Sequence, residues 1–476
     1  MNIVDIVLHA NAQHGDHIAI KDEHGALSYS EFAEEVKKLS KVLISRGLKE
    51  GMGVGIMDRN SRYFIISVFA VLHCKAVAMP VSNQLKTQEL DTILNNAGLN
   101  WLLDAGNGPM SSAHEISTYE IQNSKWTIRA YRGFTGERFA SHVADPAIVR
   151  YTSGTTGLAK GVIIGHNSIN ERIDGANKAL QLGRKDTVVW VLPMSYHFVV
   201  SIILYLKYGA TIALAKDFLA ESIHSCIRAT NGTFLYASPM HIKLLSKYVN
   251  DKEIPSLKTV ISTSTAISRE QCELFYERYK IPVSQAYGII EIGLPIINFD
   301  KAAEHPDAVG HVLDGYDVGI LSETNELLGE GEIGHLGIKG PGMFDAYLSP
   351  AKMRNEVLNK GYFMTGDLAS KDASGLVRVE GRKKSMINVS GNKVFPVEVE
   401  QVLCSHPDIL LARVSGYKHR FMGEIVSAEL VLREATEKDA EAIISYCRER
   451  LTTYKIPQKI KFVDSLEMTD SGKLKR

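Results

Sequence analysis

Residues 151–162, which read YTSGTTGLAKGV, have the composition of a loop that binds phosphate rather than that of a core element. Glycine adopts positive φ without steric cost, and a backbone of that kind turns successive N–H groups into one anion-holding concavity. The hydroxyl groups of this run add donors, and its lysine adds a positive charge. The residues concerned are Ser153, Gly154, Thr155, Thr156, Gly157, Lys160 and Gly161. The pattern predicts a polyphosphate ligand.

Two other interpretations of this loop are weaker. A Walker loop requires Gly-Lys-Ser/Thr after four spacer residues, whereas Lys160 follows Ala159 and precedes Gly161. A flexible linker has no need of apolar runs on both sides, and here residues 147–149 and 162–164 are apolar. We therefore interpret the loop as a ligand site.

The loop also closely resembles the phosphate loop of the AMP-forming adenylating superfamily. This superfamily contains acyl-CoA and aryl-CoA synthetases, peptide-synthetase adenylation domains and beetle luciferases. Further segments resemble its motifs and follow in its order, so the resemblance covers nearly the whole chain. They are SQAYGIIEIG (284–293), YFMTGD (362–367), EGRKKSMINVSGNKVFPVEVE (380–400) and TDSGK (469–473). The resemblance implies that the loop, with Thr152 at its start, grips the β- and γ-phosphates of ATP.

The resemblance also implies which residues hold the rest of the nucleotide. Tyr287, followed by Gly288, would lie against the adenine ring, and Asp367 would accept hydrogen bonds from both ribose hydroxyls. Glu291 would hold Mg²⁺, a hard cation that prefers carboxylate and phosphate oxygens. Thr156 of the phosphate loop would be a second protein ligand of the same ion.

Residues toward the C-terminus would carry a two-step reaction. By resemblance, Lys473 is the catalytic lysine that bridges the substrate carboxylate and the α-phosphate. Lys384 falls at the interdomain hinge, and Gly391 falls in the loop that lines the thiol tunnel. Arg382, just before the hinge, could reach ribose or phosphate. An acyl-adenylate would form first, and a pantetheine thiol would then attack its acyl carbon after the small domain has rotated.

The acid site is expected around residues 193–199. His197 falls where the superfamily carries an aromatic residue or a histidine that gates the carboxylate site, and it is a candidate catalytic residue. Phe198 and Val199 suggest an apolar pocket. Amino-acid-activating members carry an aspartate in place of Phe198, and an ammonium group buried beside a phenyl ring would cost several kcal/mol. The acid is therefore expected to lack an α-amino group and to be a fatty or aromatic acid.

Some residues depart from the pattern of the superfamily. Thr263 and Ser264 stand where two glycines are usual, and they should narrow or redirect an acyl pocket that Gly288 also lines. Ile290 replaces a threonine that donates to the α-phosphate, and the loss of one such donor could cost about 1–3 kcal/mol. These departures leave open a protein that binds ATP without turning it over.

The composition excludes several other classes of protein. Of the 476 residues, 45% are hydrophobic and 23% are charged, which is typical of a soluble globular chain with two or more domains. The 54 basic and 54 acidic residues cancel, which argues against nucleic acid or an anionic membrane as the main partner. The five cysteines lack a CxxC pair, and the N-terminus lacks a signal-peptide pattern. We expect a cytoplasmic protein without a membrane span.

Strand and helix patterns alternate along most of the chain, which predicts parallel-type sheets with helices on their faces. Ser30 is expected to cap a helix over residues 31–46, and residues 104–145 are expected to form irregular surface connections. Short strands over 317–321, 335–339 and 376–379 predict a small β subdomain. Beyond residue 396, helix and strand patterns predict a compact α+β module.

The predicted fold class is therefore α/β, with a large ATP- and acid-binding domain (1–383) and a small mobile α+β domain (384–476) that carries the catalytic lysine. The expected activity is that of an AMP-forming ligase that uses ATP, Mg²⁺ and CoA to activate a small carboxylic acid. One alternative is a stand-alone enzyme that loads the phosphopantetheine of an acyl or peptidyl carrier protein. A second is the non-catalytic adenylate-binding protein described above. A luciferase-like oxygenase would need a specialised substrate that nothing in the sequence indicates.

Overall fold

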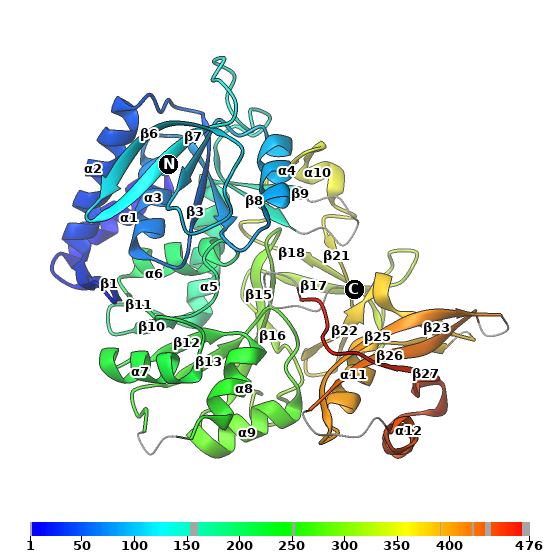
Figure 1. The fold of residues 1–476 in the computed structure, drawn as a ribbon. Coiled ribbons are helices and arrows are strands. Elements are labelled where there is room, and N and C mark those ends of the chain that lie inside the picture. The colour runs from blue at the N-terminus through cyan, green and yellow to red at the C-terminus, as the bar shows by residue number, and fades with distance from the viewer. Residues whose placement is uncertain are drawn as a thin grey trace.

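The computed structural model describes residues 2–152, 160–249, 253–390, 392–420, 423–433 and 439–468. Two large sheets, each covered by helices, form most of the molecule, and a smaller sheet and a C-terminal module lie beside them (Figure 1). None of the helices in these ranges combines the length and the apolar composition that crossing a bilayer requires.

The first large sheet carries the strands that flank the predicted phosphate loop. Its order is β20-β19-β9-β8-β4-β3-β5-β7-β6. The four central strands β8, β4, β3 and β5 pair in parallel, and the strands outside them are antiparallel. The bounds are β3 Gly53–Asp58, β4 Val77–Ser82, β5 Trp101–Asp104, β6 His114–Ile121, β7 Ser124–Ala130, β8 Pro146–Thr152, β9 Lys160–Gly165, β19 Ala346–Leu348 and β20 Ala351–Met353.

The second large sheet has the order β16-β15-β14-β13-β12-β10-β11-β1-β2. Strands β1, β11, β10, β12, β13 and β14 pair in parallel. Parallel strands end at the same edge of a sheet, so the segments that follow β10, β13 and β14 are brought together there. The bounds are β1 Ile18–Asp22, β2 Gly25–Ser28, β10 Thr187–Trp190, β11 Thr211–Leu214, β12 Phe234–Ala237, β13 Thr259–Ser262, β14 Val283–Ile289, β15 Gly293–Ile297 and β16 His311–Val312. The predicted α/β class is confirmed.

Helices pack on both large sheets, and one continuous hydrophobic core includes residues of both. Helix α5 contacts β8 and β9 of the first sheet and β15 of the second. Its buried positions Ile169, Arg172, Ile173 and Ala176 recur at helical spacing, although one of them is an arginine. The helices and helical turns are α1 Ile3–His14, α2 Tyr29–Ser45, α3 Arg62–His73, α4 Thr87–Ala97, α5 His166–Leu180, the π-helical turn Phe198–Ile202, α6 Ile203–Tyr208, α7 Ala220–Thr230, α8 Pro239–Lys247 and α9 Arg269–Tyr279.

Two expectations about local structure are wrong. Helix α2 is capped by Ser28 and not by Ser30, because Ser28 has a glutamate three residues later. The Glu31 N–H donates to Ser28 Oγ at 3.2 Å, and the Ser28 N–H donates to Glu31 Oε2 at 2.7 Å, which is a capping box. Residues 104–145 are not all irregular, since β6 and β7 form an antiparallel hairpin. This hairpin buries Tyr119 and Trp126 in the main core.

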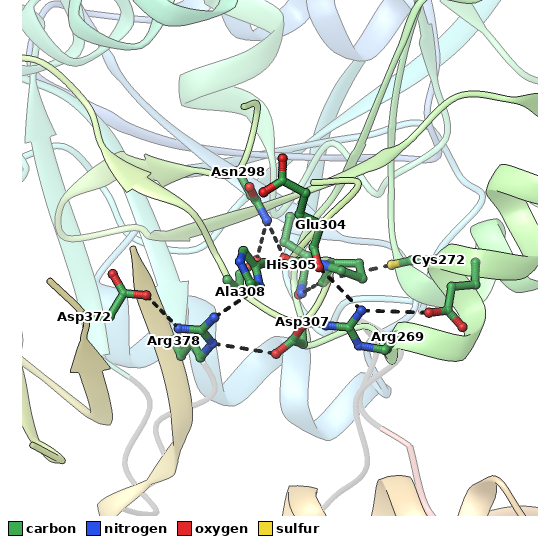
Figure 2. Close-up of polar contacts among 12 residues, drawn as sticks. Arg269, Cys272, Asn298, Glu304, His305, Asp307, Ala308, Asp372 and Arg378 are labelled. Atoms are coloured by element: carbon green, nitrogen blue, oxygen red, sulfur yellow. Dashed lines mark hydrogen bonds and ion pairs between the residues drawn. The ribbon is translucent and has the colours of Figure 1, made fainter. Parts of the chain in front are cut away.

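A small antiparallel sheet, β17-β18-β21-β22, is the predicted β subdomain. Figure 2 shows how the connection between β15 and β16 joins this small sheet to the second large sheet: Asp307 contacts Arg269 of α9 at 2.6 Å and Arg378 of β22 at 3.7 Å. Arg378 also donates to Asp372 at 3.1 Å. The bounds are β17 Asp317–Leu321, β18 Gly334–Lys339, α10 Arg354–Val357, β21 Phe363–Lys371 and β22 Val377–Arg382.

The C-terminal module has its own hydrophobic core. Strand β26 pairs with β25, and also with β23 and β27 along different stretches. The bounds are the 3₁₀ turn Lys383–Ser385, β23 Ile387–Val389, β24 Asn392–Val394, α11 Pro396–Cys404, β25 Ile409–His419, β26 Gly423–Leu432, α12 Ala440–Arg448, the 3₁₀ turn Thr453–Lys455 and β27 Lys459–Phe462. The proposed domain boundary, before Lys384, falls in the first 3₁₀ turn.

Candidate active site

Three residues predicted to bind the nucleotide meet at one carboxylate. Asp367 on β21 lies opposite Arg382 on β22, and Arg382 Nε is 2.7 Å from Asp367 Oδ1. Tyr287, on β14 of the second large sheet, donates from its hydroxyl to Asp367 Oδ2 at 2.5 Å. Burial, together with the Asp367 charge, raises the pKa of Tyr287 well above its usual value, so the phenol stays protonated and remains a donor. A carboxylate accepts hydrogen bonds at both of its oxygens, which suits the two hydroxyls of a ribose.

Glu291 lies close to the strand that ends the phosphate loop. Its Oε1 accepts a hydrogen bond of 3.1 Å from the hydroxyl of Tyr347, on β19. The ammonium of Lys160, the first residue of β9, lies 4.9 Å from the centre of the same tyrosine ring. Tyr347, on a strand that pairs with β9, therefore contacts both Glu291, through its hydroxyl, and Lys160, through its ring. Sequence reasoning did not find Tyr347, which lies outside the recognised motifs.

Arg172 of α5 holds the backbone next to Glu291. It is fully buried, its Nε donates to the carbonyl of Gly342 at 2.7 Å, and its Nη1 donates to the carbonyl of Ile290 at 2.9 Å. The Phe344 N–H donates to the carbonyl of Glu291 at 2.7 Å. Burial lowers the pKa of Arg172 to about 10, so it stays charged at neutral pH. Arg172 therefore positions Glu291. The only sign of this role in the sequence is that an arginine occupies the apolar face of a helix.

We predict that Arg172→Met will lower the free energy of unfolding by about 2–4 kcal/mol, because two backbone carbonyls lose a charged donor. Urea unfolding of the full chain measures this. Lys178→Met is the matched control, since Lys178 is an exposed residue of the same helix and its change should stay within about 0.5 kcal/mol. Equal stabilities for the two variants would contradict the role assigned to Arg172.

The predicted acid-site residues fall into two groups. His197 Nε2 is 3.3 Å from Ser264 Oγ, and its ring meets Tyr236 edge-on with the centroids 6.4 Å apart. A hydrogen bond between Tyr236 and Thr263 adds Thr263 to the same cluster. Phe198 is only 2% exposed, and its ring packs against Phe64 and Phe69 of α3. Val199, which is also buried, belongs to the same core.

The structure constrains two small residues of the predicted pocket, Ser264 and Gly288, in different ways. Ser264 has φ = +79°, in the left-handed region that favours glycine, so this serine keeps the turn conformation of the glycine it replaces. At Gly288 a side chain is excluded, because an added Cβ would lie 2.5 Å from the carbonyl oxygen of Gly293. Gly288 is therefore required by the close approach of β14 to β15, whatever its part in ligand binding.

Other predicted residues lie outside the described ranges, so their roles stay predictions. They are Ser153, Gly154, Thr155, Thr156, Gly157, Gly391 and Lys473. Thr152 ends β8, and its backbone lies opposite Lys160, so the loop connects two paired strands. Lys384 is an exposed residue of the turn between β22 and β23, which is where a hinge was expected.

Comparison with known proteins gives matches over nearly the whole chain. The AMP-binding enzyme family matches residues 7–348, and the AMP-binding enzyme C-terminal domain matches residues 398–473. Oxalate–CoA ligase of Arabidopsis thaliana is 26% identical over 94% of this chain and 92% of its own. 2-Succinylbenzoate–CoA ligase of Bacillus licheniformis is 28% identical over 97% of this chain and 96% of its own. Among solved structures, ATP-bound MatB from Rhodopseudomonas palustris has a similar fold, with a TM-score of 0.85 and 23% identity over 100% of this chain and 97% of MatB.

Proposed function

We propose, starting from the fact that this chain belongs to the AMP-binding enzyme family, that it is an AMP-forming acid–thiol ligase. It activates a carboxylic acid that lacks an α-amino group as an acyl-adenylate, and it transfers the acyl group to the thiol of CoA. The observation that carries this proposal is the meeting of Tyr287, Asp367 and Arg382, in which Tyr287 lies just before Glu291 in the chain. The end of β14 and the turn after it thus contribute Tyr287 to the proposed ribose site and Glu291 to the proposed metal site, while Asp367 and Arg382 come from the small sheet.

The side chains around Glu291 fit a magnesium ion held mainly by phosphate. Mg²⁺ usually takes one or two protein carboxylates and completes its shell with phosphate oxygens and water. In the described part of the chain no three His, Cys, Asp or Glu residues converge into a metal cage, whereas Glu291 offers one carboxylate oriented by Tyr347. Glu291, with Thr156 of the loop, would hold the ion, which when bound neutralises charge on the phosphates.

In the first step an oxygen of the substrate carboxylate attacks the α-phosphorus of ATP, and the bond to the bridging oxygen breaks. Pyrophosphate leaves with the electron pair. Asp367 fixes the ribose, the loop with Lys160 holds the β- and γ-phosphates, and Lys473 bridges the carboxylate and the α-phosphate. Positioning and charge neutralisation supply most of the rate, as in other phosphoryl transfers.

In the second step the thiol attacks the acyl carbon, and AMP leaves with the oxygen that came from the acid. The C-terminal module rotates about Lys384, which withdraws Lys473 and presents the Gly391 loop to the thiol. The 3₁₀ turn that contains Lys384 supports this role, because it separates the small sheet from the sheet of the C-terminal module.

The acid is proposed to be aromatic or fatty. The Phe198 ring packs among the aromatic rings of α3, so no carboxylate at this position is available to pair with an α-ammonium group. One curated relative is named for an aromatic acid, 2-succinylbenzoate. A pyrophosphate-release screen over fatty, aromatic, dicarboxylic and amino acids tests this assignment. We expect release with an aromatic or fatty acid and none with amino acids, whereas release with an amino acid alone would overturn it.

The acceptor is tested separately, once an acid has been found. Mass spectrometry of the products with CoA, and with a phosphopantetheine-loaded carrier protein, distinguishes a CoA ligase from an enzyme that loads a carrier. A protein that binds ATP without turnover, the alternative suggested by Ile290, Thr263 and Ser264, would bind ATP but release no pyrophosphate with any acid of the screen.

Ser264→Gly is predicted to make the enzyme accept bulkier acids. The substitution removes the hydroxymethyl group that reaches His197, and it places glycine at a positive φ that glycine adopts freely. We expect the ratio of kcat/KM for a bulky acid to that for a small acid to rise about tenfold, the effect of about one methylene group in a pocket. Asn231→Gly, which changes a left-handed residue at the end of α7, is the control and should leave the ratio unchanged. An unchanged ratio in Ser264→Gly would remove Ser264 from the pocket.

A further inference from the structure

Arg150 is a charged residue on the core-facing side of β8. Side chains alternate along a strand. Its neighbour Val149 belongs to a separate core cluster on the other face of the sheet, whereas Ile148 belongs to the main core that the two large sheets share. Arg150 is on the same face as Ile148, toward α5 and the second sheet. Strand β8 ends two residues later, where the phosphate loop begins.

One donor of the Arg150 guanidinium is left without a partner by the described residues. Its Nε is buried and has no hydrogen-bond partner among the residues that the structure describes. The guanidinium does contact an aromatic face, since its Cζ lies 5.0 Å from the centre of the Tyr196 ring. A buried donor without a partner costs about 1–3 kcal/mol, and more when the group is charged. An apolar side chain would therefore serve the core better at this position.

Two features near Arg150 indicate what could satisfy it. Glu291, the proposed metal ligand, is one of the charged groups that act on Arg150, and Tyr196 directly precedes His197 of the acid-site cluster. Arg150 is thus near both the metal side and the acid side of the candidate site. The α-phosphate of the nucleotide must lie between the same two sides, because the acid attacks it. Burial lowers the pKa of Arg150 to about 10, which leaves the guanidinium charged at neutral pH.

We propose that Arg150 binds the non-bridging oxygens of the α-phosphate and stabilises the charge that they carry while the carboxylate displaces pyrophosphate. A guanidinium presents two parallel N–H donors that match two phosphate oxygens. Ile290, the residue before Glu291, has no hydrogen-bonding group in its side chain, so a donor from β8 supplies what this segment lacks. This inference rests on the proposed function, because it requires a nucleotide in the site.

The test is nucleotide binding by the full chain, measured by calorimetry with ATP, AMP and adenosine as the probes. Arg150→Met is expected to lower the affinity for ATP and for AMP by about 10- to 100-fold and to leave the affinity for adenosine unchanged. Only ATP and AMP carry an α-phosphate. Arg150→Lys, which keeps the charge, should recover part of the loss. Arg278→Met is the matched control, since Arg278 also lies over a tyrosine ring, at 5.3 Å from Tyr279, but on helix α9.

The other outcomes are distinguishable. Unchanged affinity for all three probes overturns the role of Arg150. Weakening of ATP alone also overturns it, because that pattern indicates contact with the β- or γ-phosphate. A change confined to the KM of the acid would also overturn this role, because it indicates contact with the carboxylate. Equally weakened binding of all three probes would overturn it as well, because it indicates a purely structural residue. A wild-type chain that binds none of the probes would overturn the proposed function itself.

Discussion

Lys473→Ala is expected to lower acid-dependent exchange of pyrophosphate into ATP by about a hundredfold to a thousandfold. Negative charge accumulates on the carboxylate and α-phosphate oxygens during adenylation, and removal of one well-placed donor to such oxygens typically costs that much. The rate of the second step, in which the thiol attacks the acyl carbon, should not change. Lys473 is proposed to act only in the arrangement that catalyses adenylation. The rate of thioester formation from a supplied acyl-adenylate measures this second half on its own.

Lys475→Ala is the control for this prediction, since it removes a lysine two residues further along the sequence. It should exchange pyrophosphate at the wild-type rate. The assignment of Lys473 would be wrong if both variants behaved alike, or if Lys473→Ala slowed both half-reactions equally.

Asp367→Asn is expected to weaken ATP binding by about a hundredfold. Asp367 accepts from Tyr287 and pairs with Arg382, and it is the proposed acceptor for both ribose hydroxyls. An amide at this position turns one acceptor into a donor, which must then face either Arg382 or the Tyr287 hydroxyl and can no longer accept from the ribose. Loss of about 3 kcal/mol from hydrogen bonds to a charged acceptor corresponds to that factor.

A second measurement distinguishes ribose binding from general damage to the site. Wild-type protein should prefer ATP over 2′-deoxy-ATP, and Asp367→Asn should lose most of this preference. Asp372→Asn is the control, because Asp372 pairs with another arginine of β22, Arg378, away from Tyr287. If Asp367→Asn kept the full preference for the 2′-hydroxyl, Asp367 would not be the ribose ligand.

The sequence motifs predicted that Tyr287, Asp367 and Arg382 belong to one site, and the structure brings their side chains together, although their binding of a nucleotide stays a prediction. Eighty residues separate Tyr287 from Asp367, and they belong to different sheets. The alternation of strand and helix patterns likewise predicted the α/β class and some of the strands, because buried strands and helices leave periodic patterns in the sequence. Strand 317–321, for example, is found with the predicted bounds.

The sequence did not reveal residues whose partners are distant backbone groups or rings. The carbonyls that Arg172 contacts are 118 and 170 residues away, and no local pattern specifies such a pair. The roles of Tyr347 and Arg150 were missed for the same reason, since each side chain contacts residues that are distant in the sequence. The β6–β7 hairpin was missed because its exposed positions are polar and the Gly- and Ser-rich stretch before it resembles a loop.

The central claim is that the carboxylate of the acid attacks the α-phosphorus of ATP. An acid found in the pyrophosphate screen, labelled with ¹⁸O in its carboxylate, tests this claim most directly when it is converted to the thioester. Our account predicts AMP that carries one ¹⁸O atom, because the attacking oxygen stays on phosphorus when the thiol displaces AMP. Unlabelled AMP, or ADP with phosphate in place of AMP with pyrophosphate, would contradict it.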